Sequence, residues 1–381
     1  MIHAFSHVSE LASQIGALRE TLRAARADAP AGLCGFDGFI DSFIRMESPS
    51  SMAELGPKIA AAAGIAASYQ VRRQGEKFGG NGPLLAGALH AIFSGSLDLT
   101  YVGALGRERV LPIFEQALGG KMTLHSLADP AHSDCLEFTD GKVMLCDLRS
   151  CDEITWERLL EVVGSDALDA LLRRARFVGA VNWGKLRHAG TIWENLAARL
   201  ASLGLPAKRV HFFMDLAEFE TRPIADREAL LRTIGKITAQ CRTILSFNLK
   251  EAWQMAEVFG GDFHGRKDGA SVAELAAYLR ARIDADRIVI HPNDGAACAS
   301  AEGAVYLPGP YCQKPLISTG AGDHFGAGCL AAALLGADDT GILLAGVATS
   351  GHFVRSGRSP SFAELDVLLA RWSEGTLPER L

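Results

Sequence analysis

The stretch at residues 318–328 reads STGAGDHFGAG, and it decides how the rest of the chain is interpreted. Three small residues, Gly320, Ala321 and Gly322, lead directly into one carboxylate, Asp323, and further small residues follow. The pattern predicts a turn that passes from an extended segment into a helix. The first N–H groups of a helix have no partner within it, and glycines let such a backbone approach a ligand closely. The stretch is therefore typical of an anion site with an acid beside it.

The acid at the end of this turn requires an explanation, because a carboxylate repels an anion. Next to a phosphoryl group, a carboxylate can accept the proton of an attacking hydroxyl group. The alternative is that Asp323 is only an acid at a helix N-terminus, where the helix dipole stabilises it by about 0.3–1 kcal/mol. Since a free Asp has a pKa of about 3.9, we expect Asp323 to be ionised at neutral pH.

Strand-like and helical segments alternate along the chain and predict an α/β fold. The strands are expected at 32–36, 99–105, 176–182, 209–215, 243–248 and 287–292, and the helices at 189–203, 227–240, 270–284, 324–335 and 339–355. Because these strands are apolar throughout, they indicate a mostly parallel sheet that is covered by helices on both faces. Ligands of such sheets collect at the carboxyl ends of the strands.

Segments outside this alternation predict a small second sheet. Strand-like residues at about 41–50 and 68–78 lack the helical crossover of a parallel pair, and 130–148 contains an Asp-Gly pair between two short apolar runs, which is a hairpin signal. We interpret these three segments as a β lid; a decorative edge hairpin is the alternative. Residues 1–30 are expected to form a helical extension and 31–381 the main domain.

Composition argues against several classes of function. The chain has 381 residues, of which 48% are hydrophobic, enough for a large core. Its net charge of −6 argues against a general nucleic-acid or anionic-membrane binder, and it lacks the long apolar run of a membrane span. The eight cysteines are scattered without a C-x-x-C pair, which argues against a zinc site and favours a reducing compartment. With no secretory signal visible, we expect a cytoplasmic protein.

Three further motifs accompany the glycine turn in a fixed order. FDGFID at 36–41 ends the first strand with two carboxylates, GGNG at 79–82 opens a helix, and NLKE at 248–251 begins another. Together with GAGD at 320–323, this ordered set resembles the ribokinase-like carbohydrate kinases, also called the phosphofructokinase-B family. The resemblance covers about residues 32–370. It implies a three-layer α/β sandwich with a mostly parallel sheet and a small β lid, and ATP-dependent transfer of the γ-phosphoryl group to a sugar hydroxyl.

The resemblance also implies a role for each matching residue. Asp323 is expected to be the catalytic base, and Asn248 and Glu251 are expected to organise Mg²⁺, through water, and the phosphates of ATP. The expected anion hole is the backbone of Gly320, Ala321 and Gly322. The residues expected to bind the sugar are Asp37, Asp41, Gly79, Gly80 and Asn81. The residues expected to contact the nucleotide are Asn248, His291, Asn293, Gly295, Gly320, Gly322 and His352.

Some positions depart from the family pattern. Ile317 stands where relatives keep an acid that belongs, in several members, to a monovalent-cation site; Ile cannot coordinate a cation, which argues against activation by potassium. Leu84 stands where an Asn often contacts a ribose-type sugar. Arg107 either favours an anionic substrate or is a solvated rim residue, and Trp183 either stacks on a ligand or packs in the core.

Other functions remain open at the level of the sequence. A nucleoside kinase of the same fold and a non-catalytic sugar or nucleotide sensor are alternatives, although a sensor has no need of Asp323. An ADP-dependent sugar kinase is disfavoured because His211 is not followed by an acid two residues later, and a Rossmann dehydrogenase because no G-x-G-x-x-G follows an N-terminal strand. The expected partners are a sugar-like molecule and ATP, with neither nucleic acid nor membrane, and a homodimer through the lid is a further option.

Overall fold

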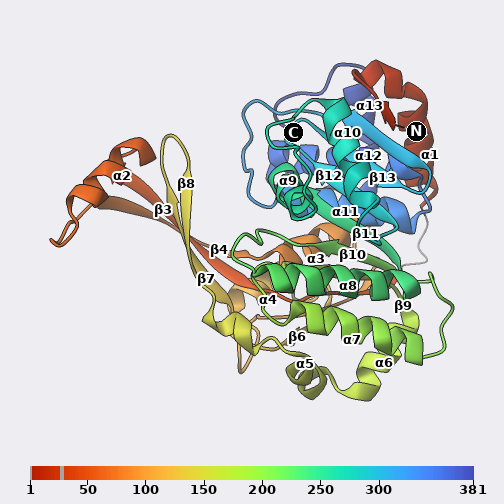
Figure 1. The fold of residues 1–381 in the computed structure, drawn as a ribbon, viewed down its shortest axis with the longest axis horizontal. Coiled ribbons are helices and arrows are strands. Elements are labelled where there is room, and N and C mark those ends of the chain that lie inside the picture. The colour runs from red at the N-terminus through yellow and green to blue at the C-terminus, as the bar shows by residue number, and fades with distance from the viewer. Residues whose placement is uncertain (1, 26–29) are drawn as a thin grey trace.

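Two sheets organise the protein, whose computed structural model describes residues 2–25 and 30–381 (Figure 1). The spatial order of the large sheet is β1 (Ile2–Ala4), β14 (Gly303–Pro308), β13 (Gly295–Ser300), β12 (Arg287–His291), β11 (Arg242–Asn248), β10 (His211–Asp215), β9 (Ala175–Val181), β2 (Ala31–Gly35), β5 (Asp98–Gly103) and β6 (Thr123–Ser126). Among these strands only β13 runs antiparallel to its neighbours. The predicted mostly parallel sheet is confirmed.

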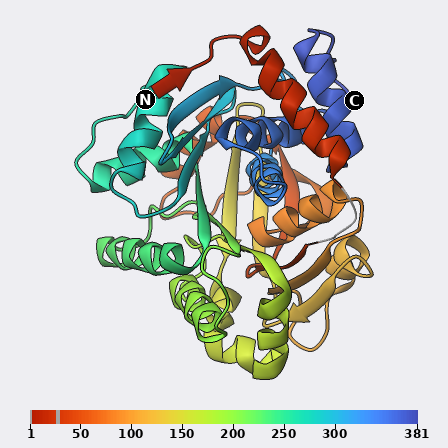
Figure 2. The ribbon, with the colours of Figure 1, turned by 90° about the vertical axis from the view of Figure 1, so that its right-hand side faces the viewer.

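Helices cover both faces of the large sheet, as the doubly apolar strands predict (Figure 2). One layer contains α1 (Ala12–Ala24), α3 (Asn81–Ile92), α4 (Pro112–Leu118), α11 (Ala321–Leu334), α12 (Asp339–Ser356) and α13 (Phe362–Ser373). The other contains α5 (Trp156–Val163), α6 (Ser165–Arg174), α7 (Ala189–Ser202), α8 (Ile224–Gln240), α9 (Leu249–Val258) and α10 (Gly269–Arg280). Two short 3₁₀ helices span Val8–Leu11 and Arg149–Glu153. The expected three-layer sandwich is therefore confirmed.

The first residues of the chain are joined to this sandwich. Strand β1 pairs in parallel with β14, and α1 packs against α12 and α13. Three apolar side chains of α1, those of Ile15, Leu18 and Leu22, are buried in the same core as α11. The domain boundary expected at residue 30 stays a prediction, while these contacts make β1 and α1 part of the sheet and of its helical layer.

The small sheet projects from the main body as an arm (Figure 1). Its strand order is β4 (Gln70–Gly79), β3 (Phe39–Ser48), β7 (Ala131–Glu137) and β8 (Lys142–Asp147), and α2 (Met52–Ala61) lies at the tip. We call these elements the lid. Strands β3 and β7 pair in parallel, so the lid is mixed and not purely antiparallel as its hairpins suggest. The reason is that the chain returns to the main body along β4, passes through α3, β5, α4 and β6, and enters β7 from the same end of the lid as β3.

Within the described part of the chain, no helix has both the length and the apolar character that a bilayer crossing demands.

Candidate active site

The glycine turn places Asp323 in the first turn of α11. Gly320 is the N-cap residue and has φ +89°, in the left-handed region that favours glycine. The helix begins at Ala321, three residues earlier than expected, because the turn itself is already helical. The N–H group of Gly322 has no hydrogen-bond acceptor among the described residues. A side chain at Gly322 would also meet the His291 ring at 3.2 Å, so this glycine lets the start of α11 approach the end of β12.

Two cavities meet at this turn. The first, of about 350 Å³, lies between the ends of β11 and β12, the 309–318 loop and α12, and we call it the loop-side cavity. The second, of about 580 Å³, lies under the lid, and we call it the lid-side cavity. Both are lined by Asn248, His291 and Gly322. Two ligands bound in these cavities would therefore face each other across the glycine turn.

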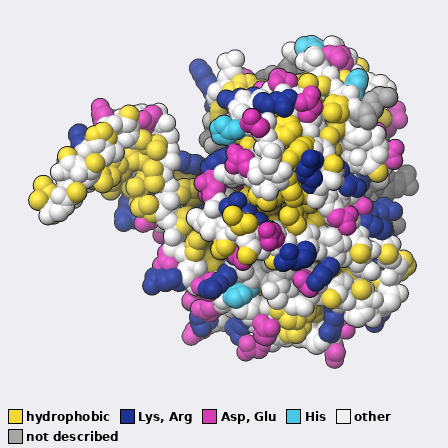
Figure 3. Space-filling view, viewed as in Figure 1, with side chains coloured by type: hydrophobic (Ala, Val, Ile, Leu, Met, Phe, Trp, Pro, Cys, Tyr) yellow, Lys and Arg dark blue, Asp and Glu magenta, His cyan; other side chains and the backbone are white. Residues whose placement is uncertain are grey.

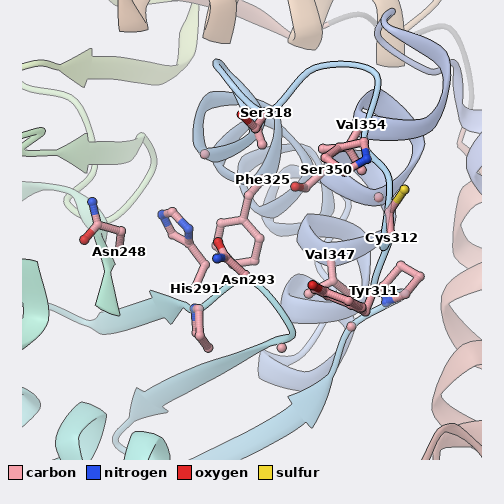
Figure 4. Close-up of a pocket in the computed structure, with 18 of the residues that line it drawn as sticks. Asn248, His291, Asn293, Tyr311, Cys312, Ser318, Phe325, Val347, Ser350 and Val354 are labelled. Atoms are coloured by element: carbon pink, nitrogen blue, oxygen red, sulfur yellow. The ribbon is translucent and has the colours of Figure 1, made fainter. Parts of the chain in front are cut away.

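The loop-side cavity gathers most of the residues expected to contact a nucleotide (Figure 4). Asn248 ends β11 and His291 ends β12; Asn293 lies in the turn that follows, and Gly295 begins β13. Burial lowers the pKa of His291 to about 4, so its ring is neutral at physiological pH, and it lies 4.7 Å from the ring of Phe325. The opposite wall is partly apolar and was not foreseen; it contains Tyr311, Cys312, Val347, Ser350 and Val354.

One residue of the expected nucleotide set, His352, lies outside both cavities. Its ring is buried, with Nδ1 3.1 Å from the hydroxyl of Ser356 and 3.3 Å from the carbonyl oxygen of Arg358. Gly351 on the same helix lines the loop-side cavity in its place. Since successive helical residues point about 100° apart, sequence proximity alone could not choose between them.

Asp323 lines the lid-side cavity next to one residue of the GGNG motif. The Asn81 side-chain amide donates to Asp323 Oδ1 at 2.9 Å, which joins motifs 242 residues apart. Burial and then the negative charge of Asp215 raise the pKa of Asp323 well above its usual value. Asp323 is therefore not the ordinary carboxylate that its free pKa suggests, because burial and the charge of Asp215 both disfavour its ionised form.

Asp37 is fully buried and does not line either cavity, although a sugar contact was expected of it. Its Oδ2 accepts hydrogen bonds from Asn81 N at 2.8 Å and from the Asn182 amide at 2.6 Å, and its Oδ1 accepts from Gly82 N at 2.8 Å. The bonds from Asn81 N and Gly82 N satisfy the first two N–H groups of α3. Asp37 thus fixes Asn81, which in turn holds Asp323.

The other sugar-site residues divide between lining and supporting positions. Asp41, Gly80 and Asn81 line the lid-side cavity. Gly79 lies behind them: a side chain there would meet the Asp41 carboxylate at 2.2 Å. Burial raises the pKa of Asp41, while hydrogen bonding to Ser133 and the charge of nearby Lys142 act in the opposite sense.

The NLKE motif forms a capping box at the start of α9. Glu251 N donates to Asn248 Oδ1 at 2.9 Å, and Asn248 N donates to Glu251 Oε2 at 3.1 Å. Glu251 and Asp215 both face the lid-side cavity, and neither forms an ion pair with a described residue. Burial, and then the charge of Asp215, raises the pKa of Glu251; burial also raises that of Asp215.

These two carboxylates suit a hydrated divalent cation. Mg²⁺ keeps most of its waters and uses one or two protein carboxylates with substrate phosphates. The described residues contain no group of three or more His, Cys, Asp or Glu side chains arranged to hold a metal ion. A bound Mg²⁺ would relieve the repulsion between Asp215 and Glu251, so the donor set fits this ion.

The lid contributes residues that the sequence pattern did not single out. Lys142, Met144 and Cys146 alternate along β8 and face the lid-side cavity. Lys142 Nζ donates to Thr319 Oγ1 at 2.5 Å, so the lid touches the residue that precedes the glycine turn. Asn182, Lys185 and Glu218 also line this cavity. The Asp-Gly signal located the hairpin, but strand register decides which face its side chains take.

Two minor candidates turn out to be structural. Trp183 is 1% exposed, and the guanidinium of Arg222 lies over its ring at 4.1 Å, so it packs and does not stack on a ligand. Arg107 is exposed and forms ion pairs with Glu153 and Asp129 away from both cavities. It is therefore a rim residue, which leaves Lys142 and Lys185 as the cations at the lid-side cavity among the described residues.

Comparisons with known proteins give consistent matches. A sequence model of the prokaryotic ketohexokinase family matches residues 10–372. The ketohexokinase of Haloferax volcanii is 26% identical over 355 residues, which cover 89% of this chain and 91% of that protein. Arabidopsis thaliana ribokinase, solved with ribose and ATP, matches with a TM-score of 0.63 and 16% identity over 90% of this chain and 99% of that one. A ribokinase II-type protein of E. coli, solved with ATP and Mg²⁺, gives 0.62 and 12% over 90% and 99%. The structural matches confirm the ribokinase-like fold.

Proposed function

Because the chain belongs to the prokaryotic ketohexokinase family and is a sugar kinase, a phosphotransferase with an alcohol acceptor, we propose that it transfers the γ-phosphoryl group of ATP to a hydroxyl group of a ketohexose. The observation that carries this proposal is the meeting of two cavities at the turn that ends in Asp323. ATP would occupy the loop-side cavity and the sugar the lid-side cavity. The ketohexose is inferred from the name of the Haloferax volcanii relative.

On the sugar side, the cavity offers a polar lining of the kind that a polyol requires. Asp41, Asn81 and Asn182 present carboxylate and amide groups, and these can pair with several hydroxyl groups at once. Phe39 is the one aromatic ring there besides that of His291 among the described residues, which favours a sugar over the flat base of a nucleoside. The role of Asp37 and Gly79 is then to support Asn81 and Asp41.

On the nucleotide side, His291, Asn293 and Gly295 would contact ATP together with the partly apolar wall of α12. The phosphates would point along the glycine turn toward Asp323. Asn248 and Glu251, at the start of α9, line the lid-side cavity together with Gly322 of the turn. Bound Mg²⁺ would neutralise phosphate charge there, with Asp215 and Glu251 as its protein partners through water.

In the reaction, Asp323 would take the proton of the attacking sugar hydroxyl as its oxygen bonds to the γ-phosphorus and the bond to ADP breaks. Asn81 holds the carboxylate in place at 2.9 Å. The N–H group of Gly322 and its neighbours in the turn would donate to the oxygens of the transferring group. General base catalysis contributes about 10²–10⁴-fold, and positioning with charge stabilisation supplies the rest of the rate.

The lid supports a homodimer as part of this proposal. Eight successive residues of β4, Gln70 to Lys77, are exposed, so this edge of the small sheet is open to solvent. Large apolar side chains also gather on the arm, whose hydrophobic surface appears yellow in Figure 3: Met52, Ile59, Ile65, Val71 and Leu145 are 38–73% exposed. Exposed apolar patches of this kind mark association surfaces. A second copy of the chain would cover this face.

The test is a coupled assay of ADP release with ATP and Mg²⁺ over ketohexoses, aldohexoses, pentoses and nucleosides, with the phosphorylated product identified by mass spectrometry and NMR. We expect a ketohexose to give the highest kcat/KM. Preference for a nucleoside, or ATP binding without turnover of any acceptor, would replace the proposal with one of the two alternatives.

A further inference from the structure

One wall of the loop-side cavity is an irregular loop. Residues 309–320 connect β14 to α11 without forming a helix or a strand. Pro310 to Gln313 and Pro315 of this loop line the cavity. A segment without a backbone ladder needs other partners to keep one conformation. The structure provides them from two distant places, the last turn of α12 and the segment 376–381.

The first partner is the guanidinium group of Arg355, which is buried with 3% of the residue exposed. It donates to the carbonyl oxygens of Pro310 at 2.8 Å, Tyr311 at 2.7 Å and Pro378 at 2.9 Å. It also donates to Gly351 O in its own helix at 3.0 Å. Ion pairs within the described part of the chain do not include Arg355. A buried cation that is held only by carbonyl oxygens fixes the backbone that supplies them.

The second partner is Glu379, whose Oε2 accepts hydrogen bonds from the loop backbone. Its donors are Gln313 N at 3.0 Å, Lys314 N at 3.3 Å and the Cys312 thiol at 3.3 Å. Arg380 donates to the carbonyl oxygen of Lys314 from the same segment. Segment 376–381 lies beyond the 10–372 span that the family model matches.

We propose that Arg355 and Glu379 are positioning residues that clamp residues 310–314 as the outer wall of the nucleotide site, with segment 376–381 acting as a strap. The proposal rests on the proposed function, in which ATP occupies the loop-side cavity. Arg355 donates hydrogen bonds to carbonyl oxygens of the loop, and Glu379 accepts hydrogen bonds from N–H groups of the loop. Since both also join the loop to segment 376–381, loss of either partner should free the loop.

An effect on ATP binding that leaves sugar binding unchanged would distinguish this positioning role from a general role in stability. None of residues 309–316 lines the lid-side cavity. Loosening the loop should therefore weaken ATP binding, because the wall must be ordered at the moment of binding. The KM for the sugar should change little, since Asp41 belongs to β3 of the lid and Asn81 and Asn182 are both hydrogen-bonded to Asp37.

The experiment compares Glu379→Gln and Arg355→Met with two matched controls in the full chain. Glu374→Gln changes a nearby exposed acid, and Arg358→Met changes an arginine in the turn after α12 that pairs with Glu364. We expect the test variants to raise the KM for ATP at least about tenfold, which corresponds to the loss of one charged hydrogen bond, with the KM for the sugar within about twofold. Both controls should keep both constants.

Hydrogen exchange gives a readout that does not depend on catalysis. Amides of residues 310–316 should exchange faster in Glu379→Gln than in the wild type, while peptides from the lid should not change. Should Arg355→Met fail to fold, Glu379→Gln alone still tests the clamp. Unchanged exchange together with an unchanged KM for ATP would overturn the proposal. If the wild type turns over no sugar with ATP yet the exchange result holds, then the proposed function fails and the clamp stands.

Discussion

At the scale of single residues, the site depends on carboxylates whose surroundings differ. Asp37 accepts three close hydrogen bonds and holds α3, whereas among the described residues Asp323 has one side-chain partner, Asn81. Asp215 lies close enough to Glu251 for its negative charge to raise the pKa of Glu251. On these differences we propose a structural role for Asp37, a catalytic role for Asp323 and a role in holding Mg²⁺ for Asp215 and Glu251.

The pH dependence of the rate follows from the raised pKa of Asp323. A base must be ionised to accept a proton, so kcat should fall as the pH drops through the raised pKa, well above the value of about 3.9 for a free Asp. A pH profile of kcat and kcat/KM measures this fall in rate on the acid side. An acid limb whose midpoint lies at or below about 3.9, the value for a free Asp, would contradict the raised pKa.

Removing one cavity carboxylate should change the metal requirement. Glu251→Gln keeps the acceptor oxygen of the capping box but deletes the charge, so half-maximal activity should need about tenfold more Mg²⁺ or more. Glu257→Gln, on the exposed face of the same helix, is the matched control. The measurement is a magnesium titration of the activity of the wild type, Glu251→Gln and Glu257→Gln. A midpoint for Glu251→Gln equal to that of the wild type would show that Glu251 does not take part in magnesium binding.

At the scale of elements, the lid meets the glycine turn through one side chain. Lys142 of β8 lines the lid-side cavity and donates a hydrogen bond to Thr319, the residue before Gly320. The lid would thus cover the sugar and place a positive charge near the transferring group. This contact depends on the register of the β7–β8 hairpin, in which Lys142 pairs with Glu137.

Lys142→Met tests the contact between lid and turn. It keeps the length of the side chain and removes a charged hydrogen bond worth about 1.5–3 kcal/mol, so kcat/KM for the sugar should fall about tenfold or more. Lys77→Met, in β4 of the same sheet and outside the lid-side cavity, should change little. Equal kinetics for the two variants would show that the lid acts without Lys142.

At the scale of the whole molecule, the apolar arm predicts association. Leu145→Asp places a charge on a side chain that is 56% exposed on the lid, and Val367→Asp does the same on α13, where Val367 is 50% exposed. Sedimentation analysis should find the wild type and Val367→Asp as dimers and Leu145→Asp as a monomer. A monomeric wild type would exclude the dimer.

The sequence predicted much of this architecture because its signals are local or ordered along the chain. Doubly apolar strands revealed the parallel sheet, and the order of the FDGFID, GGNG, NLKE and GAGD motifs pointed to the site. What it could not predict depends on contacts between distant segments. The burial of Asp37, the register that turns Lys142 toward the cavity and the rotation of α12 that turns His352 away are of this kind.

The central claim, that Asp323 is the base at the junction of the two cavities, is tested most directly by single-turnover phosphoryl transfer in Asp323→Asn. The amide keeps an oxygen for the Asn81 hydrogen bond, so the fold and both binding affinities should persist. We expect the transfer rate to fall at least about 10²-fold with saturating ATP, Mg²⁺ and ketohexose. A rate within about threefold of the wild type would contradict the account.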